Sequence, residues 1–188
     1  MFTCCKNALV VFFAAAAFCV SAFAGGEAPE WLKQAARTPV PNYEKEVDAV
    51  VLFHEEAVAL DANGRLVTVE RHVIKILQKE GVRDAVASAF YLSKFSQVKN
   101  LDAWLLAPNG AVTEFGKKET VDLISDPDDI YDEGRIKSID ASSQAEIGSI
   151  FGYTSTTEDR TLFYQQQFLF QDGHPTLVSR FSLNLPQG

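Results

Sequence analysis

The sequence predicts a mainly β protein, an antiparallel β-sandwich of about nine strands with one short N-terminal helix. Three observations lead to this fold class. Runs of β-branched and aromatic residues recur along the chain, and turn residues separate them. Asn-Gly pairs stand at 63–64 and 109–110, and such pairs are the strongest short-range signal for a β-hairpin. Only one short stretch after the first residues has the period of a helix.

Residues 1–24 have the composition of a secretory signal peptide. Lys6 is their single charge, residues 8–23 are uncharged and mostly apolar, and Ala22-Phe23-Ala24 puts small residues where signal peptidase cleaves. The apolar run is shorter than the roughly 20 residues that span a membrane, and an uncleaved anchor is the alternative. We therefore expect an exported protein, periplasmic or extracellular after cleavage near Ala24, with no membrane attachment.

Cleavage at this point would change the chemistry available to the chain. All three cysteines (Cys4, Cys5 and Cys19) precede residue 25, so the mature chain would have no disulfide, thiol nucleophile or cysteine metal site. Its 17 Lys and Arg less Lys6, against 25 Asp and Glu, give a net charge of −9. Because the densest basic group is Lys117-Lys118, we expect neither nucleic acid nor an anionic membrane surface as a partner.

The mature chain is expected to have two parts. Residues 25–45 should form a helix and a connector: Pro29 to Ala36 suits a short helix with Trp31 docked on the domain, and two prolines follow. Residues 46–188 should form one β-sandwich-type domain. We expect this domain to continue past residue 188 in a longer parent protein, and a stand-alone copy is the alternative.

The first two strands should form a hairpin from Val47 to Leu77 that turns at Asp61 to Gly64. If Asn63-Gly64 is a two-residue loop, Leu60 faces Val67; a four-residue loop would shift the pairs. In the second arm the apolar positions change from odd to even numbers near Arg71-His72. This change predicts a β-bulge there, or a strand that passes between two sheets.

The later strands are expected to begin with a meander of antiparallel hairpins. Residues 125–134 are expected to form a loop, because they are acidic, contain a proline and lack periodicity. The expected strands are 84–93, 98–106, 111–115, 135–141, 149–158, 162–171 and 177–185.

A series of short motifs follows one order along the chain. They are Val50-Val51-Leu52, Asp61-Ala62-Asn63-Gly64-Arg65, Ala103-Trp104-Leu105, Pro108-Asn109-Gly110, Phe115-Gly116-Lys117-Lys118, Tyr131 with Arg135-Ile136-Lys137, Gly148-Ser149-Ile150-Phe151-Gly152-Tyr153, Phe168-Leu169-Phe170-Gln171, and Ser179-Arg180-Phe181 with Leu185-Pro186. This ordered series resembles a bacterial domain family of unknown function that precedes a transglutaminase-like domain in exported proteins, and the resemblance covers about residues 46 to 188. It implies a β-sandwich-type domain without established catalytic residues, and it implies that a Cys-His-Asp catalytic site lies in a separate downstream domain.

The residues themselves predict no catalytic, cofactor or metal site. His54 and His72 could pair in the hairpin, but the expected register puts them on opposite faces or sets Arg or Val opposite His54, which argues against zinc. The acidic loop from Asp126 to Glu133 fails the EF-hand pattern, and another form of calcium site there stays open. A carboxylate pair for glycoside hydrolysis also stays open, because such acids come from unlinked strands.

Three functions from different classes remain. The first is a non-catalytic accessory domain that binds a downstream transglutaminase-like domain or an envelope protein. The second is a glycan- or peptidoglycan-binding module that uses exposed aromatics, among them Phe163 and Tyr164. The third is a carboxylate-pair hydrolase. The residues that we predict for an interaction surface are Trp104, Tyr131, Asp132, Arg135 and Phe168.

Overall fold

A computed structural model of the chain describes residues 26–43, 46–61, 63–126, 133–160, 167–171 and 173–185. The signal-peptide prediction and most of the acidic loop with its calcium hypothesis therefore lie outside the described residues. No helix within these ranges is long and apolar enough to cross a membrane.

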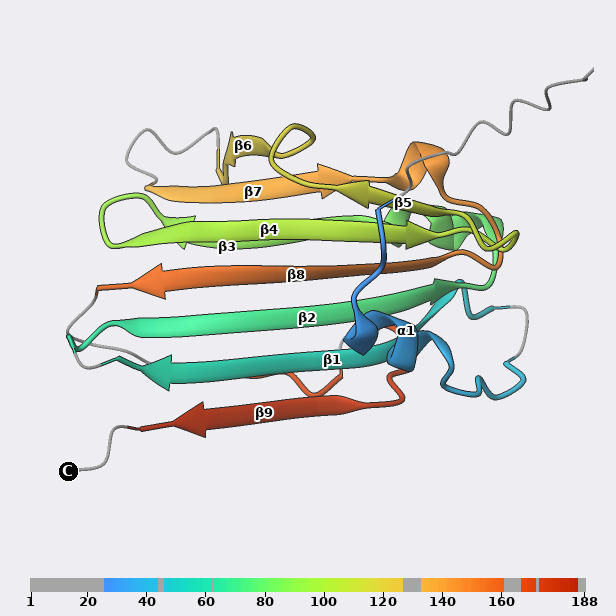
Figure 1. Ribbon diagram of the computed structural model, residues 1–188, viewed down its shortest axis with the longest axis horizontal. Helices are drawn as coiled ribbons and strands as arrows, with labels where there is room; N and C mark the ends of the chain where they lie inside the picture. Colours follow the sequence, from blue (N-terminus) through green and yellow to red (C-terminus); the bar gives the residue numbers. More distant parts are fainter. Residues whose placement is uncertain are drawn as a thin grey trace, which may run out of the picture.

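Nine strands and three short helical segments make up the described parts of the chain (Figure 1). The α-helix α1 begins one residue after Pro29 and ends at Ala36, as predicted. The elements are α1 (Glu30–Ala36), β1 (Ala49–Leu60), β2 (Leu66–Ile76), the 3-10 helix η1 (Lys79–Asp84), β3 (Val86–Leu92), β4 (Ser96–Leu106), β5 (Val112–Phe115), β6 (Val121–Ile124), β7 (Gly134–Asp140), the 3-10 helix η2 (Ser142–Gln144), β8 (Ile150–Asp159) and β9 (Ser179–Asn184).

The strands form two sheets, which confirms the sandwich class. The larger sheet has the order β5-β4-β8-β2-β1-β9 and the smaller has the order β3-β7-β6. The smaller sheet packs on the β4 and β8 half of the larger one, behind it in Figure 1. One pair departs from the prediction: β9 runs parallel to β1, because the chain returns to the sheet edge by a long connection instead of a hairpin.

The six-stranded sheet is covered on both faces. On its inner face, alternate residues of the two sheets form the main core, with Ile139 and Phe151 fully buried. On the opposite face α1 lies across β1 and β2 (Figure 1), and Leu32 is completely buried there beside Trp104. The predicted docking of Trp31 is confirmed, since its ring meets that of Trp104 edge-on with centroids 6.1 Å apart.

The β1–β2 hairpin forms where it was predicted, but its register differs by one residue. Leu60 faces Leu66 rather than Val67. The same shift runs along the arms and sets His54 directly opposite His72. The prediction that these two histidines lie on opposite faces, or that Arg or Val stands opposite His54, is therefore wrong.

The side chain of Asp61 sets this register. Its Oδ1 accepts hydrogen bonds from the backbone N–H of Asn63 (2.8 Å) and of Arg65 (2.9 Å), and the N–H of Asp61 donates to the carbonyl oxygen of Arg65 (2.8 Å). Asp61 and Arg65 thus close the ladder, and the loop is longer than Asn63-Gly64 alone. Gly64 has a φ of 73°, which glycine adopts without steric cost.

The predicted bulge near His72 is also misplaced. The irregularity lies in the other arm, between Val51 and Phe53, and β2 pairs without interruption. The change of apolar phase in β2 has another cause: Thr68 and Glu70 share the inner face with His72, and both line a polar cavity between the two sheets. Polar residues there replace the apolar ones that continue the core at Ile74 and Ile76.

Three further predictions about strands are wrong. No strand was predicted directly before the acidic loop, yet β6 lies there as an exposed edge strand, and its alternation is hidden because neither of its faces is buried. A strand was expected at 162–171, but residues 167–171, the part of this range that the structure describes, form no strand. The meander is interrupted, since β3 joins the smaller sheet and β4 pairs with β5 and β8.

Candidate functional site

Four rings line up across the inner face of the six-stranded sheet. They belong to Tyr153 on β8, His72 on β2, His54 on β1, and Phe168 in the segment that leads to β9. Successive ring centroids are 5.6, 5.5 and 4.9 Å apart. The pairings His72–Tyr153 and His54–His72 are direct cross-strand neighbours. The register therefore builds a continuous ladder from residues that are far apart in the sequence.

Burial in the ladder favours the neutral form of both imidazoles. Burial, together with the charges of His54 and His174, lowers the pKa of His72 to about 4, and burial lowers the pKa of His54. Glu70 lies beside the ladder, where its Oε1 accepts a hydrogen bond from the Tyr153 hydroxyl at 2.8 Å and is 3.7 Å from His54 Nε2. Burial raises the pKa of Glu70. In the described part of the chain, no group of three or more His, Cys, Asp or Glu side chains is arranged to hold a metal ion.

A polar cavity of about 600 Å³ adjoins the ladder between the two sheets. Glu56 and Glu70 stand directly opposite each other on β1 and β2, and both line the cavity with Asp159. Burial also raises the pKa of Asp159. Glu56 and Glu70 are therefore a candidate for the carboxylate pair that the sequence left open. Contrary to the expectation, the two acids come from one hairpin and not from unlinked strands.

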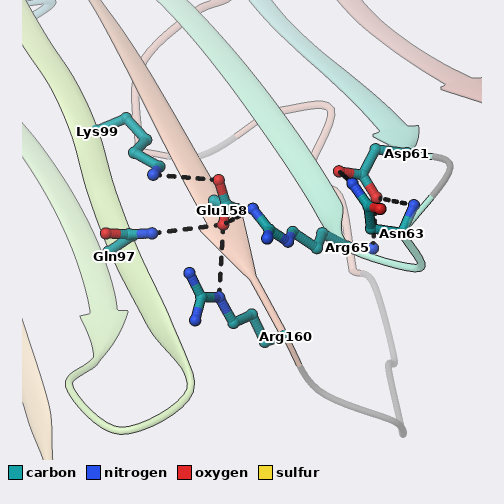
Figure 2. A network of polar contacts seen from close by, with 7 residues as sticks. All are labelled: Asp61, Asn63, Arg65, Gln97, Lys99, Glu158 and Arg160. Carbon is teal, nitrogen blue, oxygen red and sulfur yellow. Dashed lines mark hydrogen bonds and ion pairs between the residues drawn. The ribbon is translucent and has the colours of Figure 1, made fainter.

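A second polar cluster surrounds Glu158 near the hairpin turn (Figure 2). Its carboxylate lies 3.0 Å from Arg65 Nη1, 3.2 Å from Lys99 Nζ and 3.5 Å from Arg160 Nε, and it accepts a hydrogen bond from Gln97 (3.4 Å). Glu158 is only 8% exposed. Burial opposes its ionisation, but the hydrogen bond from Lys99 and the charges of Arg65 and Lys99 lower its pKa. Glu158 of β8 has partners on β4 and at the hairpin turn, so it ties the hairpin to its neighbouring strands.

The outer face of the small sheet is apolar and open to solvent. On β3, Ala87 and Ala89 point into the core, so Phe90 and Leu92 point outward, and they are 56% and 41% exposed. Ile136 of β7 stands between Phe90 and Leu123 of β6, and Leu123 is 53% exposed. We call Phe90, Leu92, Val121, Leu123 and Ile136 the outer apolar face.

The structure does not gather the five residues predicted for an interaction surface. Trp104 is 8% exposed and packs under α1, so the prediction of an exposed Trp104 is wrong. Arg135 pairs with Asp122 (2.9 Å) on the small sheet, and Phe168 belongs to the ring ladder. Tyr131 and Asp132 lie outside the described residues, as do Phe163 and Tyr164.

The outer apolar face was not predicted, although the sequence carries a signal for it. In residues 86–92, Ala87 and Ala89 share one face while Phe90 and Leu92 share the other. A strand that is apolar on both faces has one face to bury against something else. The sequence does not show which face of this strand stays open. In the described part of the chain, no strand or helix covers Phe90 and Leu92.

Comparisons with known proteins give two findings. A family model described as a domain of unknown function with a solved structure (DUF3857) matches residues 62–188. The fold is also similar to part of a crystal structure from Parabacteroides distasonis, described as that of a candidate protease, with a TM-score of 0.54 and 11% identity. No curated protein matches the sequence.

The structural match is partial on both sides. It covers 62% of this chain and 24% of the other chain. At 11% identity it shows a shared fold and carries no information on activity. The other protein is thus much longer than the part that resembles this chain.

Proposed function

We propose that this chain, which belongs to the DUF3857 family, is an exported, non-catalytic accessory domain that binds another protein domain through its outer apolar face. The partner that we propose is a transglutaminase-like domain, and an envelope protein is the alternative. Two findings support a role within a larger assembly: the family match spans residues 62–188, and the shared fold occupies 24% of a longer protein. The composition of residues 1–24 supports export.

The outer apolar face is the observation that carries this proposal. Phe90 of β3 and Val121 and Leu123 of β6 are each at least 50% exposed, and Ile136 of β7, the strand between β3 and β6, joins them on the same face. Contiguous apolar patches are uncommon on monomeric proteins, and they mark interaction sites when they occur. Burial of such side chains in an interface contributes about 25 cal/mol per Å² of apolar surface before the costs of association.

Calorimetric titration tests the proposal. The purified protein would be titrated with a separately produced transglutaminase-like domain from the same genome, as wild type and as the variants Phe90→Asp and Leu123→Asp. We expect each variant to weaken binding by about tenfold or more, because a buried unpaired carboxylate opposes association. Ile147→Asp is the matched control, since Ile147 is 57% exposed but lies outside the small sheet. Absence of binding by wild type, or equal binding by all variants, contradicts the proposal.

A second candidate function rests on the polar cavity. The opposed Glu56 and Glu70, with Asp159 nearby, have the composition of a carboxylate-pair hydrolase, and the raised pKa of Glu70 suits a proton donor. Glu70→Gln would abolish hydrolysis of a cell-wall glycan if this function holds. Failure of the wild type to release products from such glycans would remove this candidate.

A further inference from the structure

Three charged side chains form a row on the α1 side of the six-stranded sheet. Glu55 of β1 is paired in register with Arg71 of β2 on one side and with Arg180 of β9 on the other. Arg71 Nη1 donates to Glu55 Oε2 (2.9 Å), and Arg180 Nη1 donates to Glu55 Oε1 (3.0 Å). Two guanidinium groups therefore share one carboxylate.

This row lies in a cleft of about 360 Å³, a volume within the range of small-ligand sites. Trp31 of α1 and Phe53 of β1 contribute aromatic walls. The guanidinium carbon of Arg71 lies 5.7 Å from the centre of the Trp31 ring, and that of Arg180 lies 5.8 Å from the Phe53 ring. These cation–π contacts orient both arginines.

The cleft carries a positive charge on an acidic protein. The charged side chains in its lining are Glu55, Arg71 and Arg180, which leaves one net positive charge, whereas the whole chain has a net charge of −8. Glu55 is partly buried, with 12% of its side chain exposed, while 39% of Arg71 and 60% of Arg180 remain exposed. The shared carboxylate thus lies beneath two accessible cations.

Both arginines retain hydrogen-bond donors. Each guanidinium has five N–H groups, and the bonds to Glu55 use only Nη1. No other hydrogen bond joins Arg71 or Arg180 to a described residue. A second carboxylate above the row could accept from these donors in the paired geometry that arginine favours.

We propose that this cleft binds a carboxylate attached to an apolar group, with the C-terminal residue of a peptide as the ligand class. The guanidinium groups of Arg71 and Arg180 hold the carboxylate, and the rings of Trp31 and Phe53 contact the apolar side chain. This site lies on the opposite face of the large sheet from the small sheet, so it is independent of the outer apolar face.

A pair of probe ligands tests the role of the carboxylate. N-acetylphenylalanine and N-acetylphenylalaninamide share the aromatic ring and differ in the charge of the terminal group. We expect the purified protein to bind the acid at least about tenfold more tightly than the amide, since hydrogen bonds to charged groups are worth about one factor of ten. We also expect the acid to shift the NMR signals of the arginine Nε–H groups in the cleft. Equal binding of acid and amide, or no binding of the acid, overturns the proposal.

Variants and a third probe complete the test. Arg180→Gln and Arg71→Gln should each weaken binding of the acid by about tenfold, while Arg83→Gln, which removes an exposed arginine paired with Asp48, should bind like wild type. Thermal melting verifies that each variant is folded, and Arg180 is exposed enough to be replaced without loss of packing. Wild-type affinity in both cleft variants overturns the proposal. Inorganic phosphate that binds as tightly as the acid overturns the assignment to carboxylates.

Discussion

Replacing His72 by phenylalanine should remove a large part of the loss of stability that the protein suffers in acid. In the folded chain the pKa of His72 is about 4, against a usual value of 6.5, because the imidazole is buried in the ring ladder beside His54 and His174. Phenylalanine keeps a planar ring next to Tyr153 but cannot bind a proton.

The sign and size of the effect follow from these two pKa values. Above pH 6.5 the imidazole is neutral in the folded and the unfolded chain, so the stability is fully present. As the pH falls from 6.5 towards 4, the unfolded chain binds a proton that the folded chain does not, and the free energy of unfolding decreases. At about pH 4.5 the loss is about 2 to 3 kcal/mol, since each pKa unit corresponds to about 1.36 kcal/mol.

Urea unfolding at about pH 7.5 and about pH 4.5 measures this change. The comparison of wild type with His72→Phe cancels the titration of the other groups near the ladder, including Glu70 and Asp159. The difference in unfolding free energy between the two proteins should shift by about 2 to 3 kcal/mol in favour of the variant at the lower pH.

Phe151→Leu is the control, because it alters a fully buried neighbour without removing a titrating group. It should lower stability equally at both pH values. The reasoning is refuted if wild type and His72→Phe lose stability in parallel, or if the NMR signal of His72 in the folded protein titrates near 6.5.

Three further predictions concern stability. Gly152→Ala should lower the free energy of unfolding by about 1 to 3 kcal/mol, because a Cβ there would lie 2.5 Å from Leu32 Cδ1. Leu32→Ala should lower it by about 2 to 5 kcal/mol. The double variant should lose less than the sum of the two, which a double-mutant cycle by urea unfolding would measure. Glu158→Gln should lower the melting temperature and reduce its dependence on salt, since it removes the charge that three cations share; an unchanged melting temperature would contradict a stabilising role of the Glu158 cluster. Gly64→Ala should lower the free energy of unfolding by about 1 kcal/mol. The loss comes from the backbone, because φ is 73° and nothing lies within 4 Å of the added Cβ. Gly64→Asn should lose less, and equal losses in the two variants would argue against the backbone as the cause.

Local signals predicted most of the elements. Pro29 and the apolar stripe after it predicted α1, and the Asn-Gly pairs predicted the turns at 63–64 and 109–110. The error of one residue in the hairpin register arose because the Asp61 side chain bonds the turn backbone, and that bonding lengthens the loop. A slip of one residue moves every side chain to the other face, which is why the paired histidines were missed.

The candidate sites were less accessible to sequence reasoning. The outer apolar face depends on which side of β3 meets the large sheet, and the Arg71–Glu55–Arg180 row depends on the parallel pairing of β9 with β1. That pairing joins residues more than a hundred positions apart in the chain. No periodicity within one strand encodes which strand becomes its neighbour.

The sequence by itself determined the β class, the single short helix, the positions of most strands and the acidic character of the chain. These properties depend on local backbone preferences and composition, which act over a few residues. The tertiary structure alone decided the split into two sheets, the parallel edge strand and the clusters at His72, Glu158 and Glu55. Those features depend on contacts between distant segments, and their free energy is gained only when the whole fold brings the segments together.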